Sequence, residues 1–111
     1  MHQGDGTAKI FENNDQVYTF SAHSKKNYPL VRQQSNKDIE LEDDITDEEY
    51  LNMVSKSLEF VNKMNFDFVF YVAGVDIHKD DKLGKLNIST EGIKKREKIN
   101  FIVKYLIINI Y

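Results

Sequence analysis

Acidic and histidine side chains gather in two short stretches of this 111-residue sequence. The first is the glycine-bracketed segment His2-Gln3-Gly4-Asp5-Gly6. The second follows an apolar run and contains Asp76, His78, Asp80 and Asp81. Imidazole and carboxylate groups can bind a divalent metal or exchange protons with a substrate. A solvated surface loop has the same composition, so the residues alone leave both interpretations open.

Two other kinds of site fit these stretches poorly. Asp76, His78 and Asp80 alternate as calcium ligands do, but the positions where an EF-hand loop needs Gly and Glu hold other residues. The first stretch matches neither a phosphate-binding loop nor a dinucleotide-binding fingerprint. We interpret His78 as a loop residue rather than a ligand.

The composition excludes several classes of protein. With 15 Lys and Arg against 18 Asp and Glu, the chain lacks the positive charge that favours nucleic acids. The absence of cysteine excludes disulfides, Cys-ligated zinc fingers and thiol nucleophiles. No segment has the pattern of a signal peptide, and the longest apolar run, Phe101 to Tyr111, is too short to span a bilayer. We expect one domain over residues 1–111, a cytoplasmic location, and neither nucleic acid nor membrane as a partner.

The first half of the chain contains signals for a helix, a strand and a second helix. Residues 7–13 have the composition of a short helix, and residues 17–21 are typical of a strand. Residues 23–44 are polar and without periodicity, which predicts a long loop. The segment Thr46-Asp47-Glu48-Glu49 forms a capping box, which predicts a helix with one apolar stripe from there to about residue 64.

The second half predicts one more strand and one more helix. Residues 68–72 are apolar on both alternating faces, as in a central parallel strand covered by helices on each side. Thr90 is the expected N-cap of a helix that carries Ile99, Val103 and Leu106 on one face. Alternating strands and helices predict an α/β fold. Ligands in such folds collect beyond the carboxyl ends of the strands, where the second acidic stretch lies.

Four segments taken together resemble successive blocks of the histone deacetylase superfamily. They are HQGDGTAKIF, VYTFSAHSKKNYP, FVFYVAGVDIHKDDKLG and STEGIKKRE. They follow the family's order and spacing over nearly the whole chain, and HQG resembles the bacterial members. The resemblance implies a partial three-layer parallel sheet of the arginase/deacetylase type, present here as a single partial domain over residues 1–111.

The resemblance also implies a metal site and residues around it. It assigns zinc to His2 and Asp81, together with an Asp two residues before His2 that is not in this sequence. Asp5 matches the acid that orients a histidine of the family's active-site tunnel. Asp76 matches a recurrent acid of the loop after the strand, to which we assign no role.

Other matching positions concern a second ion and the substrate tunnel. The carbonyls of Phe11 and Val17, with Ser21, match parts of the family's structural monovalent-cation sites, which implies a possible potassium ion. Tyr28 stands where the family usually has a Phe lining the acyl-lysine tunnel. We interpret His23, in the same block, as a residue that hydrogen-bonds the loop.

The activity that the resemblance implies is zinc-dependent hydrolysis of an acetylated amide, in acetyl-lysine or an acetylpolyamine. The first Asp ligand, the paired histidines and the catalytic Tyr of the family have no counterpart in this sequence. We therefore expect a fragment that is inactive alone, with a separately encoded other half as its partner and with residues 101–111 as its most exposed apolar patch. The alternatives are a non-catalytic interaction module on the same scaffold and a relic without function.

Overall fold

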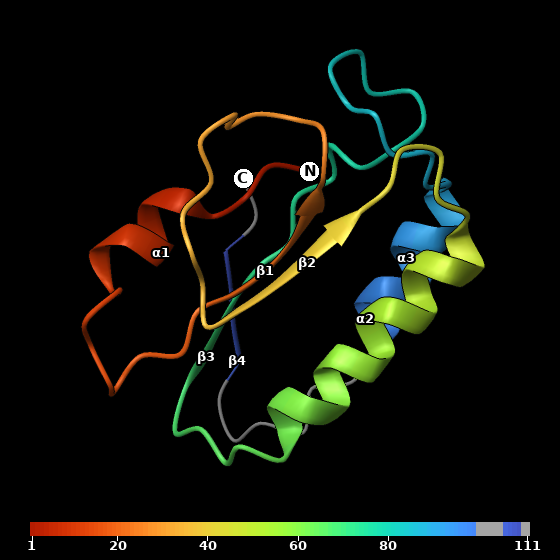
Figure 1. Cartoon of the computed structure of the whole chain (residues 1–111). Helices are drawn as coiled ribbons and strands as arrows, with labels where there is room; N and C mark the ends of the chain where they lie inside the picture. The colour runs from red at the N-terminus through yellow and green to blue at the C-terminus, as the bar shows by residue number, and fades with distance from the viewer. Residues whose placement is uncertain (100–105, 110–111) are drawn as a thin grey trace.

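The computed structural model describes residues 1–99 and 106–109, and for 106–109 the backbone alone. Within these described residues, three helices and four strands follow one another (Figure 1). Their bounds are α1 Asp5–Ile10, β1 Phe20–Ser24, β2 Lys37–Leu41, α2 Asp47–Asn62, β3 Val69–Val72, α3 Thr90–Lys98 and β4 Leu106–Asn109. Helix α1 lies on one side of the strands, and α2 and α3 lie on the other. The mixed α/β architecture predicted from the sequence is confirmed.

Helix α2 begins at the predicted capping box. Thr46 Oγ1 accepts a hydrogen bond from the Glu49 amide at 3.3 Å, while the Glu49 carboxylate accepts from the Thr46 amide at 3.0 Å. This pairing satisfies amides at the helix start that have no partner within the helix. The buried side of α2 includes Tyr50, Leu58 and Val61. Local sequence alone therefore determines where this helix begins.

Helix α3 begins beside the start of α2, because a carboxylate in the first turn of α2 accepts hydrogen bonds from the N-cap residue of α3. Asp47 accepts from the Ser89 amide at 2.8 Å and from its hydroxyl at 2.5 Å. Ser89 Oγ then accepts from the Gly92 amide, so Ser89 and not the predicted Thr90 is the N-cap. A Cβ atom at Gly92 would lie 2.5 Å from the Asp47 carboxylate. The glycine is needed for this close approach.

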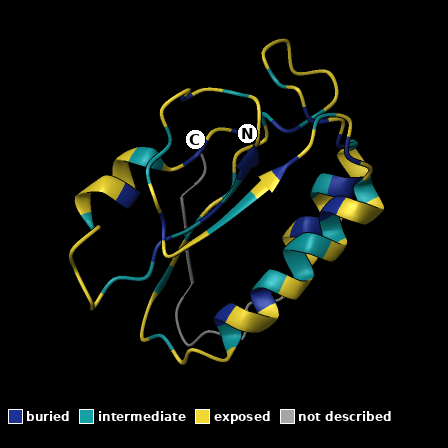
Figure 2. Ribbon diagram, viewed as in Figure 1, coloured by how far each residue is buried: buried dark blue, intermediate teal, exposed yellow. Residues whose placement is uncertain are grey.

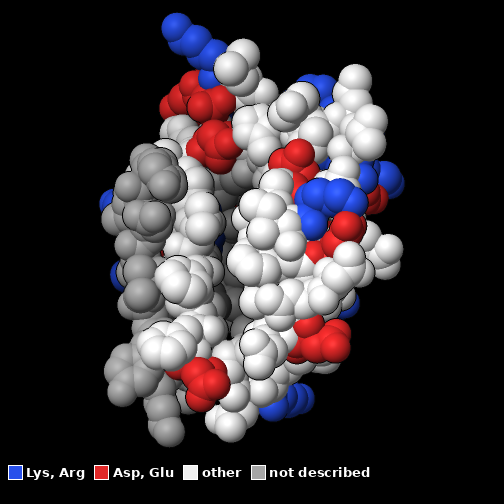
Figure 3. Space-filling view, turned by 90° about the vertical axis from the view of Figure 1, so that its left-hand side faces the viewer, with Lys and Arg blue, Asp and Glu red and all other residues white. Residues whose placement is uncertain are grey.

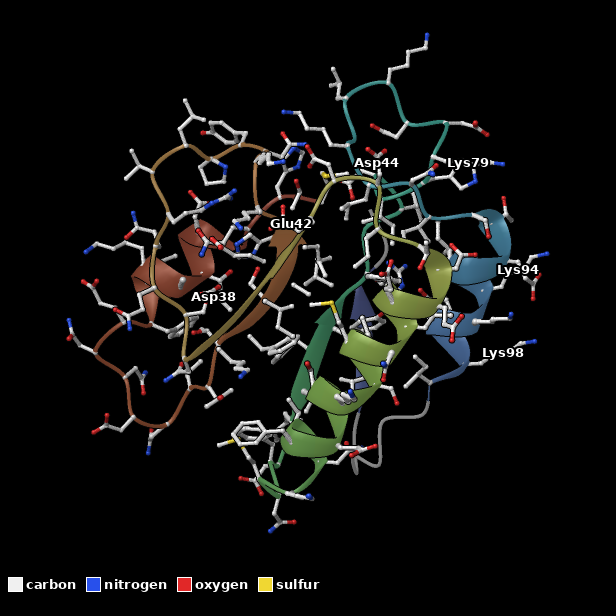
Figure 4. All side chains as sticks on the ribbon, turned by 45° about the vertical axis from the view of Figure 1, so that its right-hand side comes forward. Asp38, Glu42, Asp44, Lys79, Lys94 and Lys98 are labelled. Atoms are coloured by element: carbon white, nitrogen blue, oxygen red, sulfur yellow. The ribbon has the colours of Figure 1, made fainter. Side chains whose placement is uncertain are left out.

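The C-terminal helix is shorter than predicted. Helix α3 ends at Lys98, with Ile99 as its C-cap residue in an extended conformation. Leu106, which the sequence pattern assigned to the helix, lies in β4 instead. Val103 and the side chains of the apolar run 101–111 lie outside the described residues. Lys94 and Lys98 extend from the solvent side of α3 (Figure 4).

The first strand and the predicted loop differ from the sequence prediction. The strand occupies Phe20–Ser24 instead of residues 17–21, and β2 lies inside the segment predicted as a loop. Strand β2 pairs in parallel with β1, with Phe20 beside Lys37 and Ser24 beside Leu41. Its sequence KDIEL has few apolar residues, and Asp38 accepts hydrogen bonds from the Gln3 side chain and the Ser35 amide. The pattern of β2 is therefore set by neighbours far away in the chain.

The strands form two separate parallel pairs. One pair is β1 with β2, and the other is β3 with β4, in which Val69 lies beside Leu106. The core gathers where the carboxyl end of β2, the start of α2 and the segment before α3 meet, and includes Leu41, Tyr50 and Ile88. Figure 2 shows buried residues in dark blue. The prediction that β3 is covered on both faces is wrong within this chain. Phe70 and Val72 are each 71% exposed, while Val69 and Tyr71 on the other face are half-buried.

Candidate functional site

His2 and Asp76 meet at the carboxyl end of the strands. His2 lies three residues before the start of α1, and Asp76 lies four residues after the end of β3. The His2 Nδ1 atom is 3.4 Å from Asp76 Oδ2, and the Met1 amino nitrogen donates to Asp76 Oδ1 at 3.2 Å. Both side chains remain partly open to solvent. An imidazole nitrogen and a carboxylate oxygen thus face each other at an accessible strand end.

Two contacts position the loop that carries Asp76. The Arg96 guanidinium, buried on α3, donates to the Gly74 carbonyl at 2.8 Å. At Gly84 a Cβ atom would lie 2.5 Å from the Asp76 carbonyl oxygen and 3.2 Å from the Asp81 Cβ. Glycine is required there because any larger residue would push these backbone segments apart. The loop is therefore fixed at both of its ends.

Asp81, the predicted second zinc ligand, lies in the same region but its carboxylate faces its own loop. Asp81 Oδ1 accepts hydrogen bonds from the Leu83 amide at 2.9 Å and the Gly84 amide at 2.7 Å. Such a side-chain-to-backbone turn is an ordinary structural role of Asp. His78 also contacts its surroundings, because its Nε2 lies 2.9 Å from Thr90 Oγ1. Asp76 is the acid of this stretch that contacts His2.

The separation of His2 and Asp76 suits a bound zinc ion. Two ligand atoms each about 2.1 Å from a tetrahedral zinc lie about 3.4 Å apart. The observed distance between Nδ1 and Oδ2 is 3.4 Å. Among the described residues, however, no group of three or more His, Asp or Glu side chains could hold a metal. The residues fit two of the three protein ligands that a catalytic zinc normally has.

Tyr28 lies beside His2, as a tunnel residue would. Its ring is 6.3 Å from the His2 ring in an edge-on arrangement and is 68% exposed. The loop that carries it is held by Arg32, whose guanidinium donates to the carbonyls of Ser24 and Asn27. The Tyr28–Pro29 peptide bond is cis. An aromatic wall next to the candidate metal position is therefore present in the chain.

Ser21 takes part in a buried polar cluster. Its hydroxyl accepts from the Gly4 amide at 3.3 Å and lies 3.0 Å from His23 Nδ1. His23 is only 1% exposed, and burial, together with the charge of Arg32, lowers the pKa of its ring. The ring therefore stays neutral at pH 7 and bonds to a neighbouring strand residue, not to the loop. Asp5, at the start of α1, is half-buried and follows Gly4, whose amide donates to Ser21.

Phe11 and Val17 bracket a turn after α1. The Asn14 amide donates to the Phe11 carbonyl at 3.0 Å, and the Val17 amide donates to the Asn14 carbonyl at 3.1 Å. Both residues line a shallow pocket of about 230 Å³, together with Tyr18 and Asn36. Their role in binding a monovalent cation, like that of Ser21, stays a prediction.

Two residues of this region were given no role from the sequence. Asp76 carried a usable signal, because it is the first acid after the strongest strand and such positions often bind ligands. Arg96 carried none, since a basic residue in the last turn of a helix is usually a surface residue. Only the packing of α3 against the strand-end loop reveals its contact with Gly74.

The sequence of the chain matches a family model and is similar to other proteins. The sequence model of the histone deacetylase domain matches residues 1–105. An uncharacterized protein of Picosynechococcus is 42% identical over 100 residues, which cover 89% of this chain and 33% of the relative. Histone deacetylase 2 of Arabidopsis thaliana is 32% identical over 102 residues, which cover 87% of this chain and 26% of the relative. The chain thus spans a quarter to a third of the length of these relatives.

Solved structures share the fold. A histone deacetylase homologue from Aquifex aeolicus superimposes with a TM-score of 0.76 at 23% identity, over 99% of this chain and 34% of that one. A homologue complexed with SAHA gives 0.74 at 24% identity, over 97% of this chain and 34% of that one. The fold is that of a part of an arginase/deacetylase-type domain. By its sequence, the chain belongs to the histone deacetylase family.

Proposed function

We propose that this chain supplies part of a zinc-dependent amide-hydrolysing site and is inactive by itself. His2 and Asp76 would be two of the metal ligands. Zinc bound between such ligands polarises a carbonyl and lowers the pKa of water. The contact that carries the proposal is the 3.4 Å approach of His2 Nδ1 to Asp76 Oδ2.

The choice of Asp76 over Asp81 as the acidic ligand is a revision of the sequence-based proposal. The Asp81 carboxylate already accepts two backbone hydrogen bonds within its turn. Asp76 instead faces His2 and the backbone nitrogen of Met1. Because metal ligands must converge on one point, the residue that contacts His2 is our first candidate. Asp81 stays the second candidate, because both of its backbone hydrogen bonds go to Oδ1.

The surroundings support an acylated amine as the substrate of the completed site. Tyr28, beside His2, would provide an aromatic wall for the aliphatic part of an acetyl-lysine or acetylpolyamine. Small-molecule sites are mostly lined by such apolar and aromatic side chains. In this proposal Asp5 orients a group from the rest of the domain, and Phe11, Val17 and Ser21 bind potassium. A separately encoded polypeptide that completes the site is the proposed partner, in the cytoplasm. Among the described residues, no helix has the length and apolarity that crossing a membrane needs.

Zinc binding by the purified chain tests this proposal. Isothermal titration with Zn²⁺ should show weak binding that His2→Ala and Asp76→Asn each weaken at least about tenfold, as loss of one ligand does. Asp81→Asn is the matched control, because it changes a nearby acid of the same loop, and it should leave the affinity within about twofold. Equal losses at Asp76 and Asp81, or no loss at His2, would contradict the assignment.

Turnover measurements test the second half of the proposal. The chain alone should release no acetate from acetyl-lysine peptides or acetylspermidine at saturating zinc. A zinc-dependent turnover that His2→Ala abolishes would show that the chain is a complete enzyme. Zinc-independent partner binding with no effect of His2→Ala would favour the alternative, a non-catalytic interaction module.

A further inference from the structure

Helix α3 carries one basic side chain that points into the protein. Lys94 and Lys98 are exposed on this helix, whereas Arg96, midway between them, is only 7% exposed. Residues two positions apart lie roughly 200° apart around a helix, so Arg96 faces away from both lysines. On the face shown in Figure 3, by contrast, Lys and Arg side chains lie at the surface, mostly toward its margin. Because a buried charge is costly unless it is hydrogen-bonded, the acceptors of Arg96 indicate its role.

The Arg96 guanidinium links three parts of the chain. Its Nη1 atom donates to the carbonyl of Gly74, 22 residues earlier in the sequence and just after β3, at 2.8 Å. Its Nε atom donates to the carboxylate of the neighbouring Glu97 at 2.7 Å. Tyr50, in the first turn of α2, also interacts with the guanidinium. Arg96 therefore joins α3 to the start of α2 and to the loop that carries Asp76.

Gly74, which accepts the bond from Arg96, lies directly against the Asp76 carboxylate. A Cβ atom at Gly74 would be 2.8 Å from Asp76 Oδ1 and 3.7 Å from Asp76 Cγ. The shorter distance is closer than van der Waals contact allows. The Asp76 side chain thus folds back over the backbone of Gly74. A shift of Gly74 would therefore shift the surface on which this carboxylate rests.

The backbone on the other side of Asp76 is held by the segment before α3. The Ile88 amide donates to the Ile77 carbonyl at 3.2 Å, and the Lys79 amide donates to the Ile88 carbonyl at 2.9 Å. Ile77 and Ile88 are 4% and 0% exposed. These bonds fix the backbone after Asp76, whereas the bond from Arg96 fixes the backbone before it. A metal ligand needs such support, because the residues behind it determine how precisely it is placed.

We propose that Arg96 is a positioning residue for Asp76, the first candidate for the acidic zinc ligand. Its bond to the Gly74 carbonyl holds the backbone over which the Asp76 carboxylate lies, and so keeps Asp76 Oδ2 directed at His2 Nδ1. In this role Arg96 touches neither metal nor substrate. The inference rests on the proposed function, in which His2 and Asp76 bind zinc. Replacing a residue that orients a metal ligand typically weakens metal binding about 10–100-fold.

Zinc titration of the full 111-residue chain tests this role with two substitutions at position 96. Arg96→Met keeps the aliphatic part of the side chain but cannot donate to the Gly74 carbonyl, so it should weaken zinc binding at least about tenfold. Arg96→Lys keeps N–H donors and should restore the affinity to within about threefold of that of the original chain. An unchanged affinity in Arg96→Met, or an equal loss in both variants, would overturn the proposal.

Three further variants separate positioning from a general loss of stability. Glu97→Gln removes the carboxylate beside Arg96 but not the bond to Gly74, so zinc affinity should stay within about twofold. Leu58→Ala should lower the free energy of unfolding without changing zinc affinity, and a loss of affinity equal to that of Arg96→Met would show that Arg96 acts through stability alone. Gly74→Ala should displace the Asp76 carboxylate and weaken zinc binding. An unchanged affinity in Gly74→Ala would overturn the proposal even if Arg96→Met did not fold.

A measurement on the metal-free chain separates this inference from the proposed metal site. The nuclear Overhauser effect between the His2 ring protons and the Asp76 Cβ protons reports their proximity by NMR. If Arg96→Met removes this signal from a folded chain but His2→Ala leaves zinc affinity unchanged, the positioning role stands and the metal assignment fails. If zinc affinity depends on His2 and Asp76 while Arg96→Met changes neither the signal nor the affinity, the metal assignment stands and the role of Arg96 is wrong.

Discussion

The strand pair β1–β2 and the strand pair β3–β4 have the same parallel pairing but very different surroundings. In the first pair Ser24, His23 and Leu41 are almost fully buried by other parts of this chain. In the second, β3 alternates between half-buried and exposed residues, and the exposed ones are the apolar Phe70 and Val72. Other parts of the 111-residue chain bury residues of the first pair, whereas one face of β3 in the second pair is exposed.

This difference shows how burial and polarity are distributed in a partial domain. In the first pair, Ser21 lies within hydrogen-bond distance of His23, and Asp38 accepts from Gln3 and Ser35. The buried Ser24 hydroxyl has no hydrogen-bond partner among the described residues. The exposed face of β3 contains residues typical of a core. A sequence suited to burial but left exposed is the usual mark of an interaction surface.

The largest expected effect is the loss of a core side chain from the first pair. Leu41→Ala removes a side chain that is 1% exposed and should lower the free energy of unfolding by about 2–5 kcal/mol, measured by urea denaturation. Val72→Thr, a matched change in the second pair, should alter it by less than about 0.5 kcal/mol. Similar losses for both variants would remove the contrast between the two pairs.

A smaller effect should come from the buried His23 of β1. Because burial and Arg32 lower the pKa of this ring in the folded chain, the folded state disfavours its protonation. The stability that depends on neutral His23 is present above the unfolded pKa of about 6.5 and is lost as the pH falls toward the lowered folded pKa. Denaturation midpoints between pH 7 and pH 5 measure this loss.

Nearby acids act against this loss. Asp38 and Glu40 favour the charged ring, so the net effect should be smaller than that of Leu41→Ala. The variant His23→Gln should flatten the decline of stability over the same pH range. An equally steep decline in that variant would assign the pH dependence to other groups.

The smallest effect on stability should come from Phe70→Thr on the open face of β3. Since Phe70 is 71% exposed, the free energy of unfolding should change by less than about 0.5 kcal/mol. The change should nevertheless reduce self-association in sedimentation runs at high protein concentration, because it removes exposed apolar area. Unchanged self-association of the variant would mean that the β3 face does not mediate self-association of this chain.

Features set by local sequence could be predicted, and those set by distant contacts could not. The start of α2 follows from Thr46 and Glu49, which bond to each other across one helical turn. Strand β2 escaped prediction because KDIEL is stabilised as a strand by pairing with β1, not by its own propensity. The predicted bounds of β1 lie three residues before the observed ones. The reason is that its buried Ser21 and His23 are polar and do not resemble core residues.

The candidate site was predicted in part for the same reason. The resemblance to the family identified His2, and the structure brings it to Asp76 and Tyr28. Whether Asp76 or Asp81 faces His2 depends on how the chain turns after β3, and the packing around Gly84 determines that turn. The Met1 side chain also lies against Gly84, although the two residues are far apart in the sequence. A pattern along the sequence does not reveal such packing.

The shared carboxylate at the start of α2 and α3 has a consequence for how the chain opens. Asp47 lies in the first turn of α2 and accepts both hydrogen bonds from Ser89, the N-cap residue of α3. Fraying of either helix at this end therefore removes a partner from the other. The two helices form one cooperative unit, so an opening event that begins at Asp47 spreads to both together.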